Sequence, residues 1–294
     1  GHRVVGLANE CDFYDPAIKR DRAKRLRDEH GIEIIEGDIR DRAAVDRAFD
    51  AAEPDAVIHV AAMAGVRPSI ADPKLYTEVN LDGTVNMLNA SVTSGVKKFL
   101  FASSSSVYGN NDKVPFSEDD PVDHPISPYA ATKRAGELIC HTYTHLHQLP
   151  VTCLRFFTVY GPGQRPDLAI GTFMRLIDQN KSVPMFGDGT TSRDYTYIDD
   201  IVNGVLAALE KCSGFNIYNL GGSSPVSLRE PIGAIGIAMG KDPKAEQLPM
   251  QPGDVARTFA DTPRARRALG FASRVWREEG LARQWASIRT DAGR

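Results

Sequence analysis

The sequence has little that would mark an exported, membrane-spanning or nucleic-acid-binding protein. Only four of its 294 residues are cysteine, and they form no C-x-x-C pair and no spacing typical of a zinc site or a disulfide framework. These four are Cys11, Cys140, Cys153 and Cys212. No stretch approaches the roughly 18 uninterrupted apolar residues of a membrane-spanning helix, and residues 1–5 lack the apolar run of a signal peptide. We therefore expect a cytoplasmic protein with reduced thiols, no metal and no membrane partner.

The sequence also has no large excess of positive or negative charge. Thirty-five Lys and Arg residues against 38 Asp and Glu give a formal net charge of -3, and no long block has a single sign. A nucleic-acid partner is therefore not expected. Hydrophobic residues at 42% and charged residues at 25% are ordinary for a globular protein, which disfavours disorder and coiled coil. At about 150 residues per domain, the length predicts one large domain or two unequal ones.

Short apolar runs alternate with longer helical patterns through the first half of the chain. The strand candidates are Arg3–Leu7, Ile32–Glu36, Ala56–Val60, Lys98–Ala102 and Val151–Arg155, and the helix candidates are Ile18–Arg27, Asp41–Ala51, Pro73–Ser94 and Pro128–His147. Strands covered on both faces by helices are continuously apolar, as these are. The alternation predicts an α/β fold with a doubly wound parallel sheet of the Rossmann type, its five strands in one sheet. Asp72 is the expected cap of the third helix.

The rhythm changes after about Gly161, where glycine and proline become more frequent and short strands and helices mix irregularly. We expect a main domain over residues 1–160 and a smaller mixed α/β lobe over 161–294, with segments near 195–220 returning to the main domain. The last helix candidate, Glu278–Arg289, is amphipathic, and its Leu281 and Trp285 are expected in the core.

The segment from Tyr129 to Lys133 carries the most chemical information. Residues four apart on a helix share one face, so the Lys133 ammonium can lie near the Tyr129 phenol. A nearby cation favours the phenolate, and moving a tyrosine pKa from about 10 to near 7 needs about 4 kcal/mol. The same spacing also occurs by chance in many helices.

A run of four serines, residues 103–106, directly follows a predicted strand. Hydroxyl groups at the carboxyl end of a parallel strand lie where doubly wound sheets bind ligands. A serine-rich turn without function is the alternative, and it explains two serines better than four.

Seven segments occur in an order that is characteristic of one family. They are Asp12–Pro16, Gly37–Asp41, His59–Arg67, Ser103–Gly109, Tyr129–Lys133, Arg155–Pro162 and Arg193–Asp200. In these segments the chain resembles the extended short-chain dehydrogenase/reductases that act on nucleotide sugars, and within them most closely the UDP-glucuronate 4-epimerases. The resemblance covers almost the whole chain. It implies NAD-dependent C4 epimerisation of UDP-glucuronate to UDP-galacturonate through a 4-keto sugar, without net redox change.

The resemblance also implies the roles of individual residues. Tyr129 would remove the O4 proton, Lys133 would lower the pKa of Tyr129 and hold the nicotinamide ribose, and Ser104 would hydrogen-bond O4. The implied NAD contacts add Asp38 and Ile39 at the adenine, Ala61 and Ala62 near the pyrophosphate and ribose, and Asn80 alongside. Residues 1–160 would then bind NAD, and residues 161–294 would mainly bind the nucleotide sugar. The implied substrate contacts are Arg67, Ser105, Ser106, Thr158, Arg165, Arg193 and Asp254.

Thr158 bears on which sugar the family resemblance implies, because related hexose epimerases and dehydratases commonly have Asn there. Once C4 of a glucuronate is oxidised, the sugar is a β-keto acid that tends to lose carbon dioxide. Neutral hydroxyl groups on Ser105, Ser106 and Thr158 would restrain the carboxylate. Dehydratases of the family have Asp-Glu in place of Ser105 and Ser106, and decarboxylases often have Glu there, so epimerisation is favoured.

The chain departs from the family pattern near its start. The family opens with a strand and a glycine-rich loop that cradles the pyrophosphate, and this first βα unit, roughly 25 to 30 residues, is expected to be absent. Ala8 stands where an acidic residue usually binds the adenosine ribose, with Asn9 as a substitute. Met63 replaces a usual Gln.

Several alternatives stay open at this stage. The chain could be another nucleotide-sugar epimerase or a UDP-glucuronate decarboxylase of the same family, or a truncated relative that binds sugar nucleotides without catalysis. His141, His145 and His147 cluster on one helix, but the Glu and the third ligand of a metalloprotease are lacking. A homodimer is implied by the resemblance, through Pro73–Ser94 and Pro128–His147.

Overall fold

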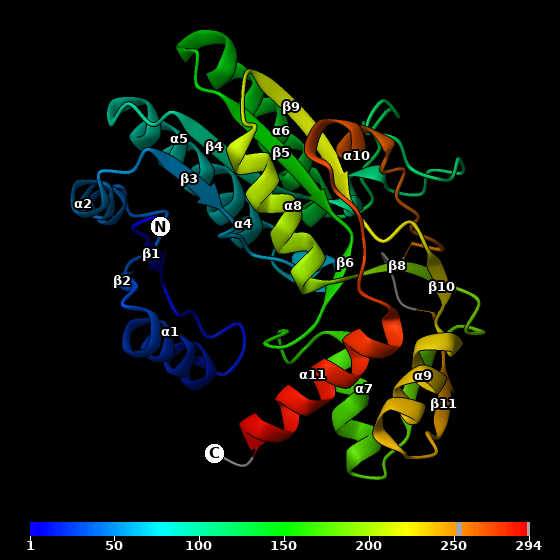
Figure 1. Ribbon diagram of the computed structural model, residues 1–294. Coiled ribbons are helices and arrows are strands. Elements are labelled where there is room, and N and C mark those ends of the chain that lie inside the picture. Colours follow the sequence, from blue (N-terminus) through cyan, green and yellow to red (C-terminus); the bar gives the residue numbers. More distant parts are fainter. Residues whose placement is uncertain (251–254, 293–294) are drawn as a thin grey trace. The chain divides into compact units, whose positions relative to one another are not determined.

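The computed structural model describes residues 1–250 and 255–292 (Figure 1). The chain divides into two compact units, each made of several stretches of sequence. The first comprises Gly1–Ser103, Ser127–Cys153 and Cys212–Asn216, and the second comprises Ser104–Ile126, Leu154–Lys211 and Ile217–Arg294. The domain division predicted at residue 160 stays a prediction.

The first unit contains most of the predicted βα alternation. Its elements are β1 (Val5–Ala8), α1 (Pro16–His30), β2 (Glu33–Glu36), α2 (Arg42–Ala52), β3 (Ala56–His59), α3 (Val66–Ala71), α4 (Pro73–Thr77), the π-helix η1 (Glu78–Asp82), α5 (Gly83–Thr93) and α6 (Pro128–His147). The unit boundary falls within three further strands, β4 (Lys98–Ser104), β5 (Val151–Phe156) and β9 (Phe215–Leu220).

The second unit mixes short strands with helices. Its elements are the 3₁₀ turn η2 (Ser105–Tyr108), β6 (Thr158–Tyr160), α7 (Ala169–Asp178), β7 (Val183–Phe186), β8 (Ser192–Tyr197), α8 (Ile198–Glu210), β10 (Pro225–Ser227), α9 (Arg229–Met239), β11 (Ala245–Leu248), α10 (Pro263–Leu269) and α11 (Arg277–Ala292).

All five predicted strands form, and the fold is the predicted Rossmann-type α/β fold, but the strands lie in two sheets. β1 pairs in parallel with β2, and a separate four-stranded sheet has the order β3-β4-β5-β9. The expectation of one five-stranded sheet was therefore wrong. Strand β9, which falls within the segments near 195–220 that we expected to return to the main domain, lies beside β5.

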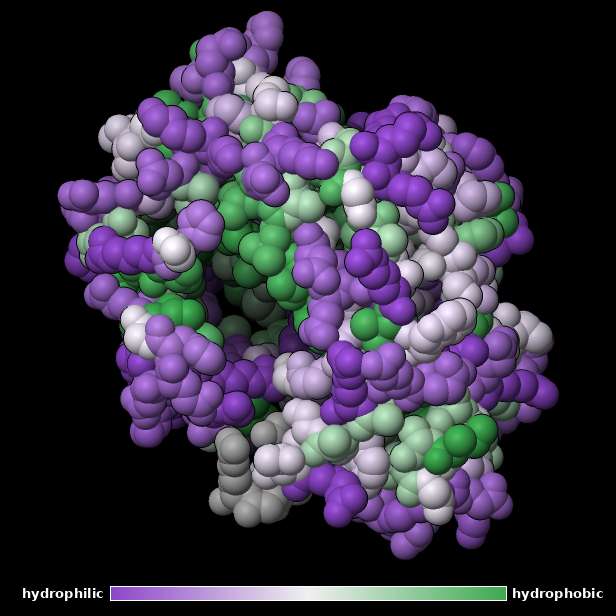
Figure 2. Space-filling view, viewed as in Figure 1, coloured by the Kyte–Doolittle hydropathy of each residue, from purple (hydrophilic) through white to green (hydrophobic). Residues whose placement is uncertain are grey.

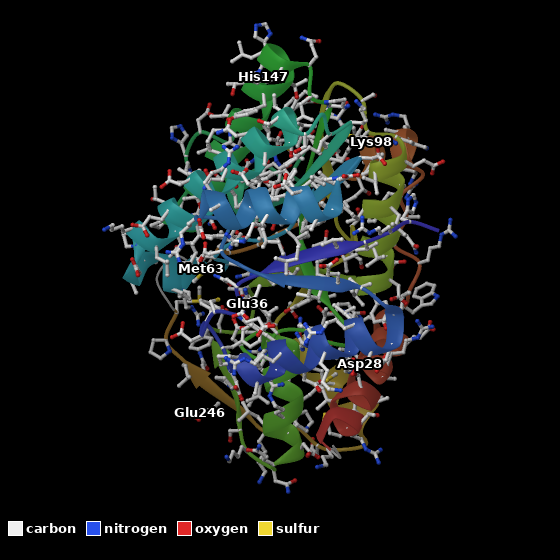
Figure 3. All side chains as sticks on the ribbon, turned by 90° about the vertical axis from the view of Figure 1, so that its left-hand side faces the viewer. Asp28, Glu36, Met63, Lys98, His147 and Glu246 are labelled. Carbon is white, nitrogen blue, oxygen red and sulfur yellow. The ribbon has the colours of Figure 1, made fainter. Side chains whose placement is uncertain are left out.

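The division between the sheets leaves two strand edges open. Among the described residues β1 has β2 as its only strand neighbour, and β3 has only β4. Ile58 on β3 and Val60 just after it are exposed at 43% and 62%, and Figure 2 shows hydrophobic residues on the viewed face where Figure 1 places β3. Figure 3 shows α1 and α2 on opposite sides of the β1–β2 pair.

The third predicted helix, Pro73–Ser94, forms as α4, η1 and α5 in succession. Asp72 caps its start, because the Asp72 carboxylate accepts a hydrogen bond from Leu75 N at 3.1 Å and Pro73 occupies the first turn. Periodicity could not predict the π-helix in the middle. A π-helical turn inserts one residue into the helical repeat, and such turns occur often at functional sites.

Helix α6 begins and ends where the sequence predicted. Ser127 caps it by accepting a hydrogen bond from Ala130 N at 3.1 Å, and Pro128 fits the first turn because its missing N–H needs no partner there. One face of α6 packs directly on β4. A Cβ added at Gly136 would lie 2.4 Å from Phe101 Cζ, so only glycine permits this closeness.

The second unit has its own core between α7, α9 and α11. Leu281 is fully buried there and Trp285 packs against the cluster, as the amphipathic pattern of Glu278–Arg289 predicted. Burying a leucine side chain stabilises a fold by about 1.5–3 kcal/mol. A second cluster packs Tyr108 against Phe116 and Phe157, with ring centroids 4.8 Å and 6.3 Å apart.

We predict that Gly136→Ala destabilises the protein by about 1–3 kcal/mol, because the new methyl group overlaps the Phe101 ring and pushes α6 away from β4. Urea unfolding at neutral pH measures the change. Gly233→Ala is the matched control, since Gly233 lies inside α9 and an added Cβ meets nothing within 4 Å. That control should be neutral or stabilised by up to about 1 kcal/mol. Equal effects in the two variants would contradict the packing argument.

Candidate active site

The first turns of α6 carry the two residues with the clearest chemistry, Tyr129 and Lys133. Tyr129 is half-buried, and its ring meets the Tyr76 ring edge-on at a centroid distance of 6.2 Å. Tyr76 is itself fixed, because its hydroxyl donates to Ala64 O at 2.9 Å. The Tyr129 phenol therefore comes from a helix whose first turn is held by a cap and by an aromatic contact.

The Lys133 ammonium is buried beside β4. Its Nζ donates to Ala102 O at 2.7 Å and lies 5.2 Å from the centroid of the Phe101 ring. Burial lowers the Lys133 pKa from the ordinary 10.5 to about 8, while Cys140 and Glu137 act in the opposite direction. At pH 7 the side chain is still mainly protonated, so a positive charge lies one helical turn beyond Tyr129.

Asn80 holds the loop after β3 against α6. Its Oδ1 accepts from Met63 N at 2.8 Å, and its Nδ2 donates to Met63 O and to Thr132 Oγ1, both at 3.0 Å. Ala61 and Ala62 lie in the same loop and are half-buried. Their small side chains leave the backbone approachable by a ligand. Asn80 thus contributes to the site first as a clamp, and it comes from the π-helix η1.

Asp38 lies at the end of β2 in a network of donors. Its carboxylate accepts from Arg40 N at 2.8 Å, from the Arg40 guanidinium at 2.8 and 3.0 Å, and from Asn9 Nδ2 at 3.0 Å. These bonds, chiefly those from Arg40, lower the Asp38 pKa to about 2. Asn9 therefore joins Asp38 directly, which the sequence did not predict. Ile39 is buried against Gly83, and its carbonyl accepts from Asn86 Nδ2 at 2.9 Å.

The residues of the first unit have the chemistry that a dinucleotide needs. A carboxylate (Asp38) and an amide (Asn9) can bind adenine or ribose hydroxyl groups, and the Ala61–Ala62 loop exposes backbone. Lys133 supplies a buried cation. Ala8, the last residue of β1, offers no side-chain acceptor for the ribose hydroxyl groups, and the next residue, Asn9, is hydrogen-bonded to Asp38.

In the second unit Ser105 and Ser106, the last two residues of the serine run, begin the turn η2. Ser104 caps it, because Ser104 Oγ accepts from Ser106 N at 3.1 Å and lies 3.1 Å from Ser106 Oγ. Ser105 and Ser106 are half-buried. The turn closes at Gly109, where φ is 57° and a Cβ would lie 2.6 Å from His124 O.

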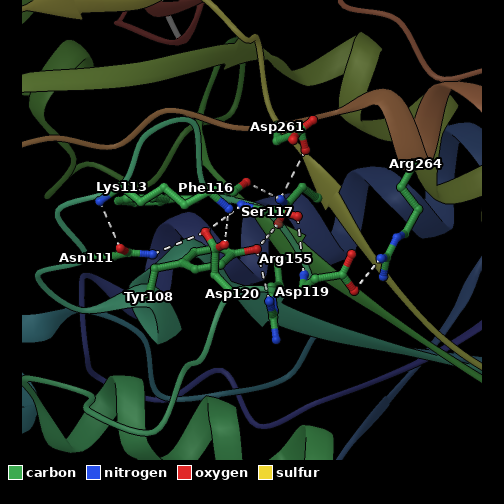
Figure 4. A network of polar contacts seen from close by, with 11 residues as sticks. Tyr108, Asn111, Lys113, Phe116, Ser117, Asp119, Asp120, Arg155, Asp261 and Arg264 are labelled. Carbon is green, nitrogen blue, oxygen red and sulfur yellow. Dashed lines mark hydrogen bonds and ion pairs between the residues drawn. The ribbon is translucent and has the colours of Figure 1, made fainter.

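A buried polar network fixes the end of this turn (Figure 4). The Tyr108 hydroxyl donates to Asn219 Oδ1 at 2.7 Å and accepts from Arg155 Nη1 at 2.9 Å, and Asn219 Nδ2 donates to Phe116 O at 2.8 Å. Arg155 is 1% exposed, and its guanidinium carbon lies 4.9 Å from the Tyr108 ring centroid. Burial raises the pKa of Tyr108, so the phenol stays neutral. Buried polar groups with complete partners hold a single geometry.

Thr158 and Arg193 lie on neighbouring strands of the sheet β10-β8-β6. Thr158 pairs with Tyr195, and Arg193 is two residues before Tyr195. Residues two apart project to the same face of a strand, so Thr158 and Arg193 share one face. On the other face the buried Asp194 carboxylate accepts from Ser223 N at 3.0 Å and from Ala260 N at 2.9 Å, which anchors β8 below Arg193.

The other predicted site residues differ in their surroundings. Arg67 is exposed in the first turn of α3. Arg165 makes a two-pronged contact with Asp167, at 3.0 and 2.8 Å. Asp254 lies outside the described residues. His141 packs edge-on against Phe215, with ring centroids 5.0 Å apart, and the described residues contain no group of three or more His, Cys, Asp or Glu suited to a metal ion.

The structure also reveals a residue that the sequence reasoning missed. Glu137 is fully buried one turn beyond Lys133, and it accepts a hydrogen bond from Ser103 Oγ at 2.6 Å. The sequence did contain a signal for Glu137, namely its spacing of four residues from Lys133, because residues four apart on a helix share a face.

Among the described residues, no helix combines the length and apolar character needed to cross a bilayer.

We predict that the buried Lys133 makes stability depend on pH in an alkaline window. Between pH 8 and pH 10.5 the unfolded chain holds the proton that the folded chain has lost, so the free energy of unfolding rises with pH there, by up to about 3 kcal/mol. Below pH 8 both states are protonated and the gain is absent. Urea unfolding of the wild type and of Lys133→Met at pH 7.5 and pH 10 measures this gain in the free energy of unfolding. A difference between the two proteins that is the same at both pH values would refute the prediction.

Known proteins resemble this chain along most of its length. The pattern of the NAD dependent epimerase/dehydratase family matches residues 1–221. A probable UDP-glucuronate 4-epimerase of Rhizobium meliloti is 40% identical, over 96% of this chain and 89% of the relative. The UDP-glucuronate 4-epimerase of Thermodesulfobacterium geofontis is 42% identical, over 96% of this chain and 87% of the relative.

Solved structures give the same result. The crystal structure of UDP-glucuronic acid 4-epimerase from Bacillus cereus, in complex with UDP-glucuronic acid and NAD, matches with a TM-score of 0.91 and 33% identity, over 98% of this chain and 91% of that one. The chain belongs to the NAD dependent epimerase/dehydratase family.

Proposed function

We propose that this chain is an NAD-dependent nucleotide-sugar epimerase that inverts C4 of UDP-glucuronate to give UDP-galacturonate. The observation that carries the proposal is the arrangement of Tyr129 and Lys133 on the first turns of α6, with Lys133 Nζ fixed on Ala102 O. The names of the relatives support the substrate, since those of Rhizobium meliloti and Thermodesulfobacterium geofontis are UDP-glucuronate 4-epimerases. The Bacillus cereus enzyme was crystallised with UDP-glucuronic acid and NAD.

Tyr129 is the proposed base that takes the proton from O4 and later returns it. The Lys133 charge stabilises the phenolate form, and its hydrogen bond to Ala102 keeps the ammonium beside β4 instead of in solvent. Ser104, the last residue of β4, is the proposed hydrogen-bond partner of O4. When bound, NAD supplies the acceptor for the C4 hydride and gives the hydride back.

Asp38, Ile39, Ala61, Ala62 and Asn80 are the proposed NAD contacts, together with Tyr129 and Lys133. Asp38 and Asn9 supply polar groups for the adenosine, and the Ala61–Ala62 loop is held at its place by Asn80 through Met63. The side chain of Ile39 is buried, so its proposed contact is made through the backbone.

The proposed substrate contacts are Arg67, Ser105, Ser106, Thr158, Arg165, Arg193 and Asp254. Ser105, Ser106 and Thr158 offer neutral hydroxyl groups for the sugar carboxylate. No carboxylate stands at positions 105 and 106, which disfavours dehydration and decarboxylation. Arg193 shares a sheet face with Thr158 and suits a phosphate, because its planar fork donates two parallel hydrogen bonds.

Assembly and location are further parts of the proposal. The exposed Leu138 and Leu146 on α6 are apolar positions of the kind that a dimer of this chain would cover. Cys140, Cys153 and Cys212 are buried thiols, in keeping with a reducing cytoplasm.

The function is tested by adding UDP-glucuronate and NAD to the purified chain and following the sugar protons by NMR. UDP-galacturonate is the expected product. Tyr129→Phe should lower the rate by at least about 10²-fold, because the base is lost, while calorimetry should show nearly unchanged UDP-glucuronate binding. Tyr143→Phe is the control. Tyr143 lies farther along α6 than Tyr129, and the change removes a phenol that donates to Asn89 Oδ1 on α5. No product from the wild type with NAD bound would favour a non-catalytic relative.

Thr158 generates a separate prediction about the fate of the 4-keto sugar. Thr158→Ala should release carbon dioxide and yield a UDP-pentose, because the carboxylate loses one hydroxyl that restrains it. Thr158→Ser keeps the hydroxyl and should form little pentose. Mass spectrometry of the nucleotide products distinguishes the two. An alanine variant that epimerises without pentose would remove this role from Thr158.

A further inference from the structure

We propose that Glu137, which the mechanism above does not use, is a positioning residue that keeps Lys133 protonated and joins α6 to the end of β4. This inference rests on the proposed function for its catalytic consequence, but the contacts that support it do not. They lie entirely within the first unit.

Glu137 is placed to act on both partners at once. It follows Lys133 by four residues in α6, so the two side chains lie on one face of the helix. Its Oε1 accepts from Ser103 Oγ at 2.6 Å, and its Oε2 lies 3.2 Å from Arg134 Nη1. The Glu137 side chain has no solvent exposure. Burying a carboxylate this completely is costly without donors and cations beside it, and Ser103 and Arg134 supply them.

Three successive residues of β4 are contacted by this one stretch of α6. Phe101 lies against Gly136, Ala102 O accepts from Lys133 Nζ, and Ser103 Oγ donates to Glu137. The next residue in the strand is Ser104, the proposed partner of the sugar O4. Glu137 therefore fixes β4 directly before a proposed catalytic residue, and it lies on the same helix, α6, as two others.

Among the titratable groups around Lys133, Glu137 is the carboxylate that raises the Lys133 pKa. From β3, His59 is neutral at ordinary pH, because burial and Lys133 lower its pKa to about 3. From α4, Tyr76 uses its hydroxyl as a donor to Ala64. On α6 itself the titratable neighbours are Tyr129, Arg134 and Cys140, and Cys140 and then Glu137 raise the Lys133 pKa against the effect of burial. Without this carboxylate the balance shifts toward neutral lysine.

The test is the pH profile of epimerisation. In Glu137→Gln, which keeps the shape and an acceptor for Ser103, the alkaline fall of kcat/KM should move to lower pH by about one unit, because the lysine loses its carboxylate. The variant should therefore lose about fivefold more activity at pH 8 than at pH 6. Ser103→Ala is the comparison: it removes the hydrogen bond but leaves the charge, so its alkaline limb should stay in place. If kcat/KM of Glu137→Gln fell at the same alkaline pH as that of the wild type, the proposal would be overturned.

A stability measurement decides the matter independently of catalysis. Glu137→Gln should cost more stability in the wild type than in Lys133→Met, because only the wild type is left with an unpaired buried ammonium. Urea unfolding of the four proteins at pH 7 gives this coupling. If the wild type shows no turnover but the coupling is present, the proposed function fails and the Glu137–Lys133 interaction stands. Additive effects would overturn the interaction itself.

Discussion

The close approach of α6 to β4 is the constraint on which the first unit depends. Gly136 permits it, since any side chain there would overlap Phe101. The same closeness lets Lys133 reach a backbone carbonyl of β4 and Glu137 reach Ser103. Packing, hydrogen bonding and electrostatics thus share one helix–strand contact. The position of Tyr129 at the start of α6 therefore depends on Gly136, two helical turns later.

The second unit achieves rigidity differently, through polar groups inside an apolar cluster. The Tyr108 hydroxyl bonds both Arg155 and Asn219 in a space lined by Phe116 and Phe157. A buried guanidinium is costly unless it is well paired. Here it contacts both the hydroxyl and the face of Tyr108. The turn that presents Ser105 and Ser106 is held by this network at one end and by the Ser104 cap at the other.

Much of the fold was readable from the sequence because its signals are local. Ser127, Pro128 and the apolar pattern predicted the limits of α6, and Asp72 was predicted as the N-terminal cap of the helix that begins with α4. Strand pairing was not readable, since the two-sheet division depends on which edges meet in space. Of the candidate site, the spacing of Tyr129 and Lys133 predicted that both lie on one helix, and both lie on α6. The link between Asn9 and Asp38 joins residues 29 apart and needed the structure, as did the contact of Glu137 with Ser103.

The open edge of β3 has a consequence for how the chain behaves in solution. An edge strand presents a row of amide and carbonyl groups that another extended backbone can extend into a larger sheet. Natural proteins blunt such edges with charge or proline, whereas here Ile58 on β3 is exposed, as is Val60 just after the end of the strand. Within the described residues nothing pairs with it. The edge therefore favours self-association through added strands, and its covering governs how concentrated the protein can be kept without aggregating.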